Sequence, residues 1–342
     1  MKDTMIGVDL AKNVFQLHAA SMTGHLKFRK KLSRPQFREF ISAQPPAVLV
    51  MEASGSANYW ARELTRLGHE VKLIAPQYVK PFVKRQKNDA TDAEAIVIAA
   101  QRPEMRFVPP KSENQQARAI LFRSRERLVN QRTELVNGLR SVLYEFGHTI
   151  PQGIGNLSRG NEILEDPNCD LPDLVRQECR DLFELIEEIT VRIDAKLKRI
   201  KALSTETDTA KRLQTMPGVG PLSALAIEAF APPLETFNSG RDFAAWLGLV
   251  PRQHSSGGKP RLGRMSKAGQ PDIRRLLIIG AMSRLSWLGR KSIPKGSWLE
   301  RMLARKPKML VAVALANKMA RALWAMQTKK ENYRDPTQTV AA

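Results

Sequence analysis

TMIGVDL, residues 4–10, is a short apolar run that carries an acid, Asp9, close to its end. Such a run predicts a buried strand that brings a carboxylate to the edge of a sheet. A second run, AVLVME at residues 47–52, repeats the pattern and ends on Glu52. Further strands are expected at 14–20, 25–32 and 70–75, and helices at 35–43 and 57–67. This alternation of strands and helices predicts an α/β domain in which helices cover a sheet.

Two further acids, Asp89 and Asp92, follow a basic segment at residues 77–87. They stand at the start of a helix expected over 92–101, which either Asp89 or Thr91 can cap. Spaced at i and i+3, the two acids share one face if the helical turn includes both. Oxygen ligands suit hard divalent cations, so the four acids together could hold metal ions. The alternative is that each is an ordinary surface acid.

The middle of the chain is expected to be helical. Residues 112–146 and 173–203 each carry an apolar stripe, and a connection rich in Gly, Pro and Asn joins them at 147–172. Two such helices predict an antiparallel coiled-coil arm. Two ordinary bundle helices fit the pattern equally well. The expected stripes are Leu121, Leu128, Leu135, Leu139 and Val142 on the first helix, and Leu182, Ile186, Ile189, Ile193, Ile200 and Leu203 on the second.

The second half of the chain predicts an all-helical domain. TMPGVGPLSALAIEAF at 215–230 is typical of two short helices joined by a turn at Gly218 and Gly220. Backbone amides of such a turn can contact a DNA phosphate, although a plain connector has the same pattern. Helices are also expected at 240–249, 271–288 and over 296–328. Lys318 and Arg321 interrupt an apolar stretch at 309–326, which favours a buried helix with a basic face over a membrane span.

Residues 250–271 form the most basic stretch, with four glycines, three serines and no acid. Its five cations are Arg252, Lys259, Arg261, Arg264 and Lys267. Cations without counter-charges on a flexible backbone predict a loop that contacts phosphate, and the alternative is a solvated surface loop. The net charge is +21, and residues 241–342 contribute 21 Lys and Arg against 5 Asp and Glu. Such a field implies a polyanionic partner, most simply nucleic acid.

Cysteine content and the N-terminus indicate a cytoplasmic protein. Cys169 and Cys179 cannot form a disulfide framework or a four-ligand zinc site. The first residues lack the apolar core of a secretion signal. No membrane association is therefore expected.

Several motifs together resemble the DEDD insertion-sequence transposases related to Piv-type DNA invertases. They are GVDLAK, VMEASG, KNDATDAEA, MPGVGPLSA, FAAWLGLVP and RMSKAGQ, in this order along residues 5–325. The resemblance implies a RuvC-like (RNase H-like) N-terminal domain and a helical C-terminal transposase domain. It further implies a recombinase guided by a structured (bridge) RNA that pairs with donor and target DNA.

The resemblance also implies roles for individual residues. Asp9, Glu52, Asp89 and Asp92 would be an acidic tetrad that binds Mg²⁺, and Ser256, directly before a glycine, would be the nucleophile. Ser255 leaves that assignment open by one residue. Ser266 is expected to be a cap or a phosphate contact, and His254 is not assigned a role. Partners would be the double-stranded DNA of the element ends and target together with the guide RNA, in a nucleoid-associated homodimer or homotetramer.

The expected organisation has four parts. They are the RuvC-like domain at 1–110, the coiled-coil arm at 111–205, the transposase domain at 206–330 and a flexible tail at 331–342. Two alternatives to a serine recombinase remain at this stage. One is a RuvC-like junction nuclease that uses water, and the other is a nucleic-acid-binding protein without catalysis.

Overall fold

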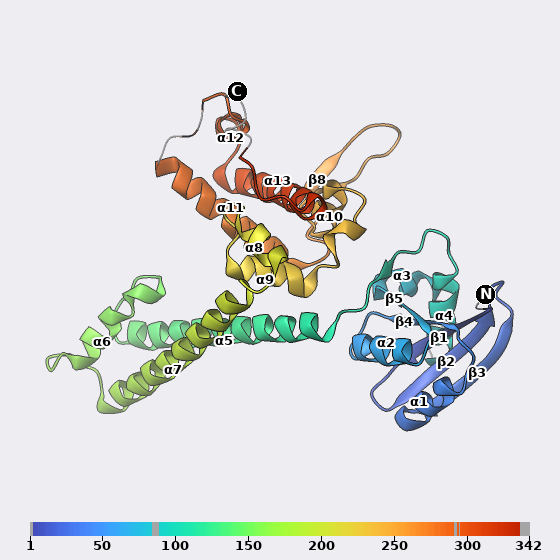
Figure 1. Cartoon of the computed structure of the whole chain (residues 1–342). Helices are drawn as coiled ribbons and strands as arrows, with labels where there is room; N and C mark the ends of the chain where they lie inside the picture. The colour runs from blue at the N-terminus through green and yellow to red at the C-terminus, as the bar shows by residue number, and fades with distance from the viewer. Residues whose placement is uncertain (1–2, 84–88, 291–292, 294, 336–342) are drawn as a thin grey trace. The chain divides into compact units, whose positions relative to one another are not determined.

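The computed structural model describes residues 3–83, 89–290, 293 and 295–335 of the 342-residue chain. The chain forms two compact units, Met1–Asn114 and Gln115–Ala342. Figure 1 shows an α/β unit in blue and cyan, and a helical unit that runs from green to red.

A six-stranded mixed sheet organises the N-terminal unit, in the order β3-β2-β1-β4-β5-β6. The strands β1, β2 and β3 form an antiparallel meander, β4 and β5 continue the sheet parallel to β1, and β6 is antiparallel to β5. The five expected strands are confirmed, whereas the two-residue β6 was not expected. The bounds are β1 Thr4–Leu10, β2 Val14–Ser21, β3 Leu26–Ser33, β4 Val48–Glu52, β5 Glu70–Ile74 and β6 Phe107–Val108.

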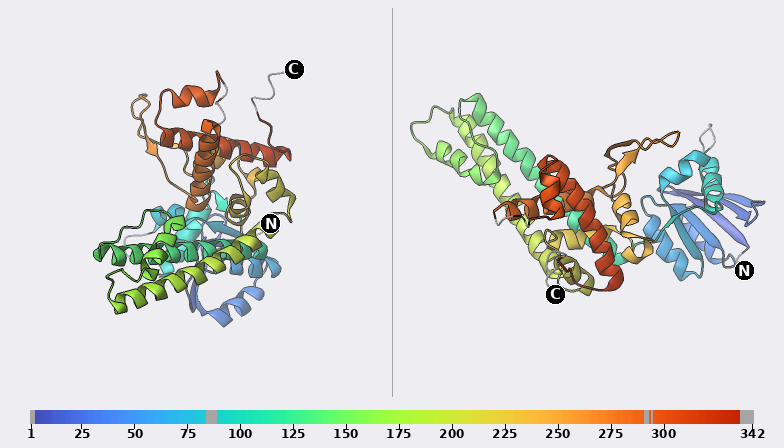
Figure 2. Two further views of the ribbon diagram at one scale, coloured as in Figure 1. Left: turned by 90° about the vertical axis from the view of Figure 1, so that its left-hand side faces the viewer. Right: turned by 90° about the horizontal axis from the view of Figure 1, so that it is seen from above.

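Helices cover both faces of this sheet (Figure 2). On one face, α1 (Arg34–Ser42) and α2 (Ala57–Arg66) pack over a core in which the rings of Phe15, Phe37 and Trp60 meet edge to face at 4.8–5.2 Å. On the other face lies α4, with α3 (Pro76–Val79) and the 3₁₀ turn Lys80–Phe82 beside it. The prediction of a sheet covered by helices is confirmed.

Helix α4 begins earlier than expected. It spans Asp89–Ala100, so Asp89 is its first residue and Thr91 lies within its first turn. The expected cap at either position is therefore wrong. Asp89 and Asp92 both lie at the start of α4, as the prediction of a shared helical turn requires.

Two long helices begin the second unit, α5 (Glu113–Glu145) and α7 (Asp173–Leu203), and they run side by side (Figures 1 and 2). Buried side chains recur every seven residues along α7, at Cys179, Ile186, Ile193 and Ile200. The connection between the helices contains a 3₁₀ turn (Ile154–Asn156) and an additional helix, α6 (Ser158–Glu165). Helix α6 was not expected from the sequence, because eight residues that include Gly160 and Asn161 give little helical signal.

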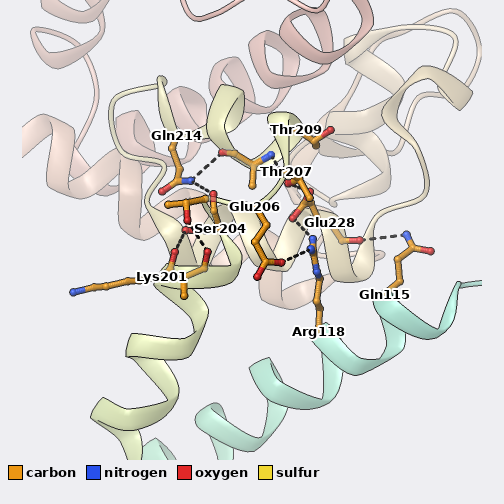
Figure 3. A network of polar contacts seen from close by, with 12 residues as sticks. Gln115, Arg118, Lys201, Ser204, Glu206, Thr207, Thr209, Gln214 and Glu228 are labelled. Carbon is orange, nitrogen blue, oxygen red and sulfur yellow. Dashed lines mark hydrogen bonds and ion pairs between the residues drawn. The ribbon is translucent and has the colours of Figure 1, made fainter.

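A polar network joins this helix pair to the rest of the unit (Figure 3). Arg118 on α5 donates to Glu228 at 2.6 Å, and Thr207 donates to the other carboxylate oxygen of Glu228 at 2.6 Å. Gln115 donates to the Glu228 carbonyl at 3.2 Å. The side chains of Arg118 and Glu228 are only 17% and 10% exposed. The network therefore fixes the start of α5 against α9 (Pro221–Phe230) and against Thr207, the N-cap of α8 (Asp208–Gln214).

The remaining helices share one large apolar core. Helix α13 is long and apolar enough to cross a membrane. Its buried side chains, among them Val311, Leu315 and Met319, belong to this core, while Lys318 and Arg321 are exposed. The prediction of a buried helix with a basic face is confirmed. The bounds are α8 Asp208–Gln214, α9 Pro221–Phe230, the 3₁₀ turn Leu234–Thr236, α10 Gly240–Trp246, α11 Pro271–Arg290, α12 Trp298–Leu303 and α13 Lys308–Lys329.

One feature of this unit contradicts the all-helical prediction. The strands β7 (Pro251–Gln253) and β8 (Leu262–Met265) pair as an antiparallel hairpin. The strands are short and almost entirely exposed, so the sequence lacks the apolar alternation that predicts a half-buried strand.

Candidate catalytic and nucleic-acid-binding site

Two of the predicted acids lie at one edge of the sheet. The strands β1 and β4 are parallel neighbours in which Val8 pairs with Met51, so Asp9 and Glu52 follow at the same level. Side chains alternate between the faces of a strand. Met5 of β1 and Val50 of β4 belong to the core beneath α4, which assigns Asp9 and Glu52 to that face.

A glycine holds the beginning of α4 close to this edge. A Cβ atom added at Gly7 would lie 2.4 Å from the carbonyl oxygen of Ala93 and 2.7 Å from Val97 Cγ2. Gly7 is two residues before Asp9 on the same face of β1, and Ala93 directly follows Asp92. The absence of a side chain at Gly7 therefore allows the first turns of α4 to rest on β1.

An ion pair attaches α4 to the strand β3 of the neighbouring sheet. Arg29 on β3 pairs with Glu94 at 3.2 Å, and Arg29 Nε donates to His18 Nδ1 at 3.3 Å. His18 is buried and lies opposite Gly7 in the register of β1 and β2. The helix that carries Asp89 and Asp92 is thus held against β1, β2 and β3. The Asp89 side chain lies outside the described residues.

The donor set suits a hard cation, since its members are all carboxylates. Within the described part of the chain, no three His, Cys, Asp or Glu side chains are grouped closely enough to hold a metal ion. Asp9 and Glu52 therefore share one face and one edge of the sheet, and Asp92 lies on the helix that packs on this face, but the three do not form a closed group. The side chain of the fourth predicted ligand, Asp89, is not among those described.

The predicted nucleophile lies at the tip of the β7–β8 hairpin, which projects from the helical unit (Figure 1). Ser256 and Lys259 pair across the turn, and Gly257 and Gly258 between them have φ values of 54° and 74°. A two-residue turn with positive φ at both positions is the type I′ geometry that matches the twist of a hairpin. Two consecutive glycines meet this requirement without strain.

The structure distinguishes the two candidate serines by their contacts. Ser255 Oγ accepts hydrogen bonds from the Arg261 N–H at 3.0 Å and from Gln253 Nε2 at 3.2 Å. Ser256 forms its turn through the backbone carbonyl, which accepts from the Lys259 N–H at 3.1 Å. Among the described residues, no hydrogen-bond partner is found for Ser256 Oγ. Ser255 thus closes the hairpin, while Ser256 presents its hydroxyl at the exposed tip.

The hairpin carries the predicted cations on an exposed surface. Residues 251–264 are all exposed, which includes four of the five cations. Arg252 Nη2 donates to the Ser266 carbonyl at 3.4 Å. In the described part of the chain, none of the five has an ion-pair partner. They are Arg252, Lys259, Arg261, Arg264 and Lys267.

Helix α11 begins at Pro271, so Ser266 does not cap it, and that expectation was wrong. The Ser266 hydroxyl is buried instead. A phosphate contact from Ser266 would therefore require a rearrangement of the surrounding chain.

The comparisons with known proteins fit this arrangement. A family model described as Transposase IS116/IS110/IS902 family matches residues 210–294, and a DEDD transposase model of the IS110 type matches residues 6–147. The chain is 45% identical over 336 residues to a probable family 20 transposase of Pseudomonas aeruginosa, covering 98% of this chain and 99% of the relative. This chain belongs to the IS116/IS110/IS902 transposase family. It is accordingly an enzyme that acts on DNA.

Other relatives agree with the family assignment. The transposase for insertion sequence element IS1328 of Yersinia enterocolitica is 40% identical, over 95% of this chain and 97% of the relative. A pilin gene-inverting protein of Moraxella lacunata is 23% identical, over 82% and 83% of the two chains. The expected resemblance to insertion-sequence transposases is confirmed, and the relation to DNA-inverting proteins holds at lower identity.

Residues that position the hairpin in this transposase were missed from the sequence. Arg274 Nη1 donates to the carbonyls of Leu247 and Ala268, both at 2.9 Å. Burial lowers the pKa of the Arg274 guanidinium. Gly248 and Gly269 lie so close to the opposite backbone that an added Cβ would be 2.1 Å from the Ala268 oxygen or 1.7 Å from the Trp246 oxygen.

The glycine turn between α8 and α9 is confirmed. Gly218 has a φ of 90°, and an added Cβ there would lie 2.6 Å from the Gly280 carbonyl oxygen of α11. Gly220 is the N-cap of α9. A groove of about 520 Å³ runs beside the turn and is also lined by Ile279 and Ser283 of α11. The transposase therefore presents the backbone of this turn next to an open groove.

Proposed function

We propose that this transposase is an RNA-guided recombinase that moves its own element by Mg²⁺-dependent strand cleavage and exchange through Ser256. The observation that carries the proposal is the Ser256 hydroxyl at the tip of an exposed hairpin. Within the part of the chain that the structure describes, this hydroxyl has no hydrogen-bond partner and the hairpin cations have no ion-pair partner. The family membership supports recombination as the reaction class, and the resemblance described above supports the RNA guide.

The α/β unit is proposed to be a RuvC-like (RNase H-like) metal domain. An antiparallel meander followed by two parallel strands, with helices on both faces, supports this assignment. Asp9, Glu52, Asp89 and Asp92 would hold Mg²⁺. When bound, the ion would stabilise the negative charge that develops on the transferring phosphate. The placement of Asp9 and Glu52 at one strand edge, beneath the helix that carries the other two acids, supports these ligands.

The serine step conserves the energy of the phosphodiester bond. Ser256 Oγ attacks the phosphorus, an Oγ–P bond forms and the bond from phosphorus to one DNA oxygen breaks. Serine loses its proton, and the departing DNA oxygen gains one and becomes a free hydroxyl. A hydroxyl from a second strand reverses the step and releases serine. Arg252, Lys259 and Arg264 would neutralise the phosphate during both steps.

DNA contacts are proposed for two further parts of the helical unit. The amides of the turn at Gly218 and Gly220, at the N-terminus of α9, would bind backbone phosphate. Arg261 and Lys267 would extend the basic surface of the hairpin. Such contacts carry no sequence information, which fits a mechanism in which guide pairing selects the target.

The paired helices α5 and α7 are proposed to act as a coiled-coil arm in a homodimer or homotetramer. The seven-residue spacing of buried side chains on α7 supports a coiled coil. Exchange between two duplexes needs several cleavages, so more than one copy of the catalytic serine is required. Ser256 would meet the carboxylates within one chain or between two copies.

A covalent-adduct assay tests this proposal. The purified transposase is incubated with Mg²⁺, its RNA and DNA carrying an element end, and protein–DNA adducts are separated on denaturing gels. Ser256→Ala is expected to abolish the adduct and retain DNA binding. Ser255→Thr, which keeps the hydroxyl that accepts from the Arg261 N–H, is the matched control and is expected to retain both. Cleavage that survives Ser256→Ala would replace the proposal with a water-using junction nuclease. Binding without cleavage under every condition would leave a non-catalytic binding protein.

A further inference from the structure

The helical unit contains a second hollow that the proposed catalytic site does not use. It has a volume of about 430 Å³ and lies between α11, α12, α13 and residues 331–335, which we name the C-terminal strap. Most of its wall is apolar, and two aromatic residues, Trp298 and Tyr333, are part of this wall. The apolar wall residues include Met216, Leu288, Leu299, Leu315, Met319 and Met326.

The strap is held at defined points. The Tyr333 N–H donates to Thr215 Oγ1 at 2.9 Å, and Arg284 Nη2 lies 3.4 Å from the Tyr333 hydroxyl. The Arg284 guanidinium also lies 5.8 Å from the centre of the Tyr333 ring. An aromatic ring with a cation beside it therefore forms one wall of the pocket.

Cations surround the pocket in excess of anions. Its lining includes Arg284, Lys318, Lys329 and Arg334 against Glu331 and Asp335. Asp335 pairs with Arg284 and Glu331 with Arg334, both at 3.8 Å. Among the described residues, this leaves Lys318 and Lys329 without an anionic partner. Lys318 Nζ lies 5.1 Å from the centre of the Trp298 ring, so the same residues join positive charge to an aromatic surface.

This combination matches the chemistry of an unpaired nucleotide. Unstacked bases bind to proteins by stacking on aromatic side chains or guanidinium groups, while nearby cations hold the phosphate. The volume lies in the range of small-molecule pockets. An apolar side chain of a protein partner would fill the walls equally well, but it would leave the two unpaired lysines without a role.

The pocket also lies next to the proposed phosphate contact. Met216 lines both this pocket and the groove beside the glycine turn, and Thr215, which holds the strap, directly precedes it. The pocket and the groove therefore share one lining residue, and the strap is anchored beside it.

We propose that this pocket binds one unpaired base of a nucleic-acid strand, with its phosphate at Lys318 and Lys329. The inference rests on the proposed nucleic-acid function and adds a site that recognises a strand distortion rather than a sequence. Because DNA and RNA share adenine, guanine and cytosine, both are sources of the ligand that the test must separate.

The test compares affinities for oligonucleotides that differ in one unpaired base. Fluorescence anisotropy gives the Kd of the full chain for a DNA duplex with a single-nucleotide bulge, the same duplex fully paired, and the RNA versions of both. A bulged 2-aminopurine reports base stacking directly. We expect bulged DNA or bulged RNA to bind about fivefold or more tightly than its paired form, and whichever shows the preference is the source.

Two variants assign the preference to the pocket. Ala322→Leu narrows it, and Ala314→Leu is a matched control at another half-buried position of α13 outside the lining. Ala322→Leu is expected to abolish the bulge preference while the affinity for paired duplex stays within twofold. Lys318→Ala, at an exposed position, is a second variant that removes the charge and its contact with the Trp298 ring without filling the pocket. Lys318→Ala is expected to reduce the preference for the bulged form severalfold. Lys308→Ala is its matched control outside the pocket lining, and it is expected to lower the affinities for bulged and paired forms equally.

The contrary results are distinct. Equal affinity for bulged and paired forms of both nucleic acids overturns the inference, as does a preference that survives both Ala322→Leu and Lys318→Ala. The Ser256 adduct is measured on the same preparations. An adduct without a bulge preference overturns the pocket alone, whereas a bulge preference without an adduct overturns the serine mechanism alone.

Discussion

Replacement of Gly7 by alanine tests the contact that places α4 over the acid-bearing edge of the sheet. The new Cβ would lie 2.4 Å from the Ala93 carbonyl oxygen, about 1 Å short of ordinary contact at 3.4 Å. The obstacle is helix backbone, which cannot rotate away as a side chain can. Helix α4 must therefore move by about 1 Å relative to β1, and such overpacking typically costs about 1–3 kcal/mol of the free energy of unfolding.

The same displacement would alter the proposed site. Asp92 directly precedes Ala93, so its carboxylate would shift from Asp9 by a similar distance. A misplacement of about 1 Å in a catalytic group lowers rates by about 100-fold, and we expect Gly7→Ala to reduce strand cleavage by about 10- to 100-fold.

Hydrogen exchange of the full chain provides the stability measurement, because it reports each unit separately. Peptides from β1 and α4 are expected to exchange faster in Gly7→Ala, and peptides from α9 and α13 to stay unchanged. Gly55→Ala is the matched control, since an added Cβ there meets nothing within 4 Å and φ is not positive. Unchanged exchange and unchanged cleavage in Gly7→Ala would refute the account of how α4 is positioned.

Three further substitutions or treatments test other parts of the structure. Arg118→Ala leaves the largely buried Glu228 carboxylate without its ion pair, and we expect thermal or urea unfolding to show a loss of about 2–4 kcal/mol. Gly138→Ala, on an exposed position in the middle of α5, is expected to stabilise the same transition by about 0.5–1 kcal/mol. Burial, together with the nearby Glu178, raises the pKa of the Cys179 thiol. We therefore expect iodoacetamide at pH 8 to label Cys169 first and Cys179 only after unfolding, which mass spectrometry of the labelled peptides measures.

Much of the fold follows from apolar patterning. The run at residues 4–10 and the run that ends on Glu52 are continuous apolar segments, and both form strands of the central sheet. Helix α7 has the bounds that its periodicity predicts, because its buried side chains recur at a fixed interval. Elements that are stabilised by burial of an apolar face can be predicted from the sequence, because the buried positions recur as an apolar pattern.

Contacts made by backbone atoms were not predictable in the same way. The β7–β8 hairpin has no apolar face, and Ser255, Arg274 and the turn at Gly257 and Gly258 hold it instead. The contact between Gly7 and α4 could not be predicted either, because a glycine in an apolar run does not indicate that a helix carbonyl lies against it. These local contacts depend on which segments meet in space, and one sequence does not reveal this.

The candidate site was therefore predicted in part. Asp9 and Glu52 were found as strand-ending acids, and the structure brings them to adjacent strands on one face. The choice between Ser255 and Ser256 could not be made from composition, since both lie in the same polar stretch. The hydrogen bonds to Ser255 Oγ support the proposal of Ser256 as the nucleophile.

The most direct test of the central claim is the identity of the residue that becomes covalently attached to DNA. The adduct is trapped, digested with nuclease and trypsin, and sequenced by mass spectrometry. Cleavage after Arg252 and Arg261 yields a peptide of residues 253–261 that contains both serines. The account predicts a nucleotide mass on Ser256. A nucleotide on Ser255 or on any residue outside this peptide, or strand cleavage without any adduct, would contradict it.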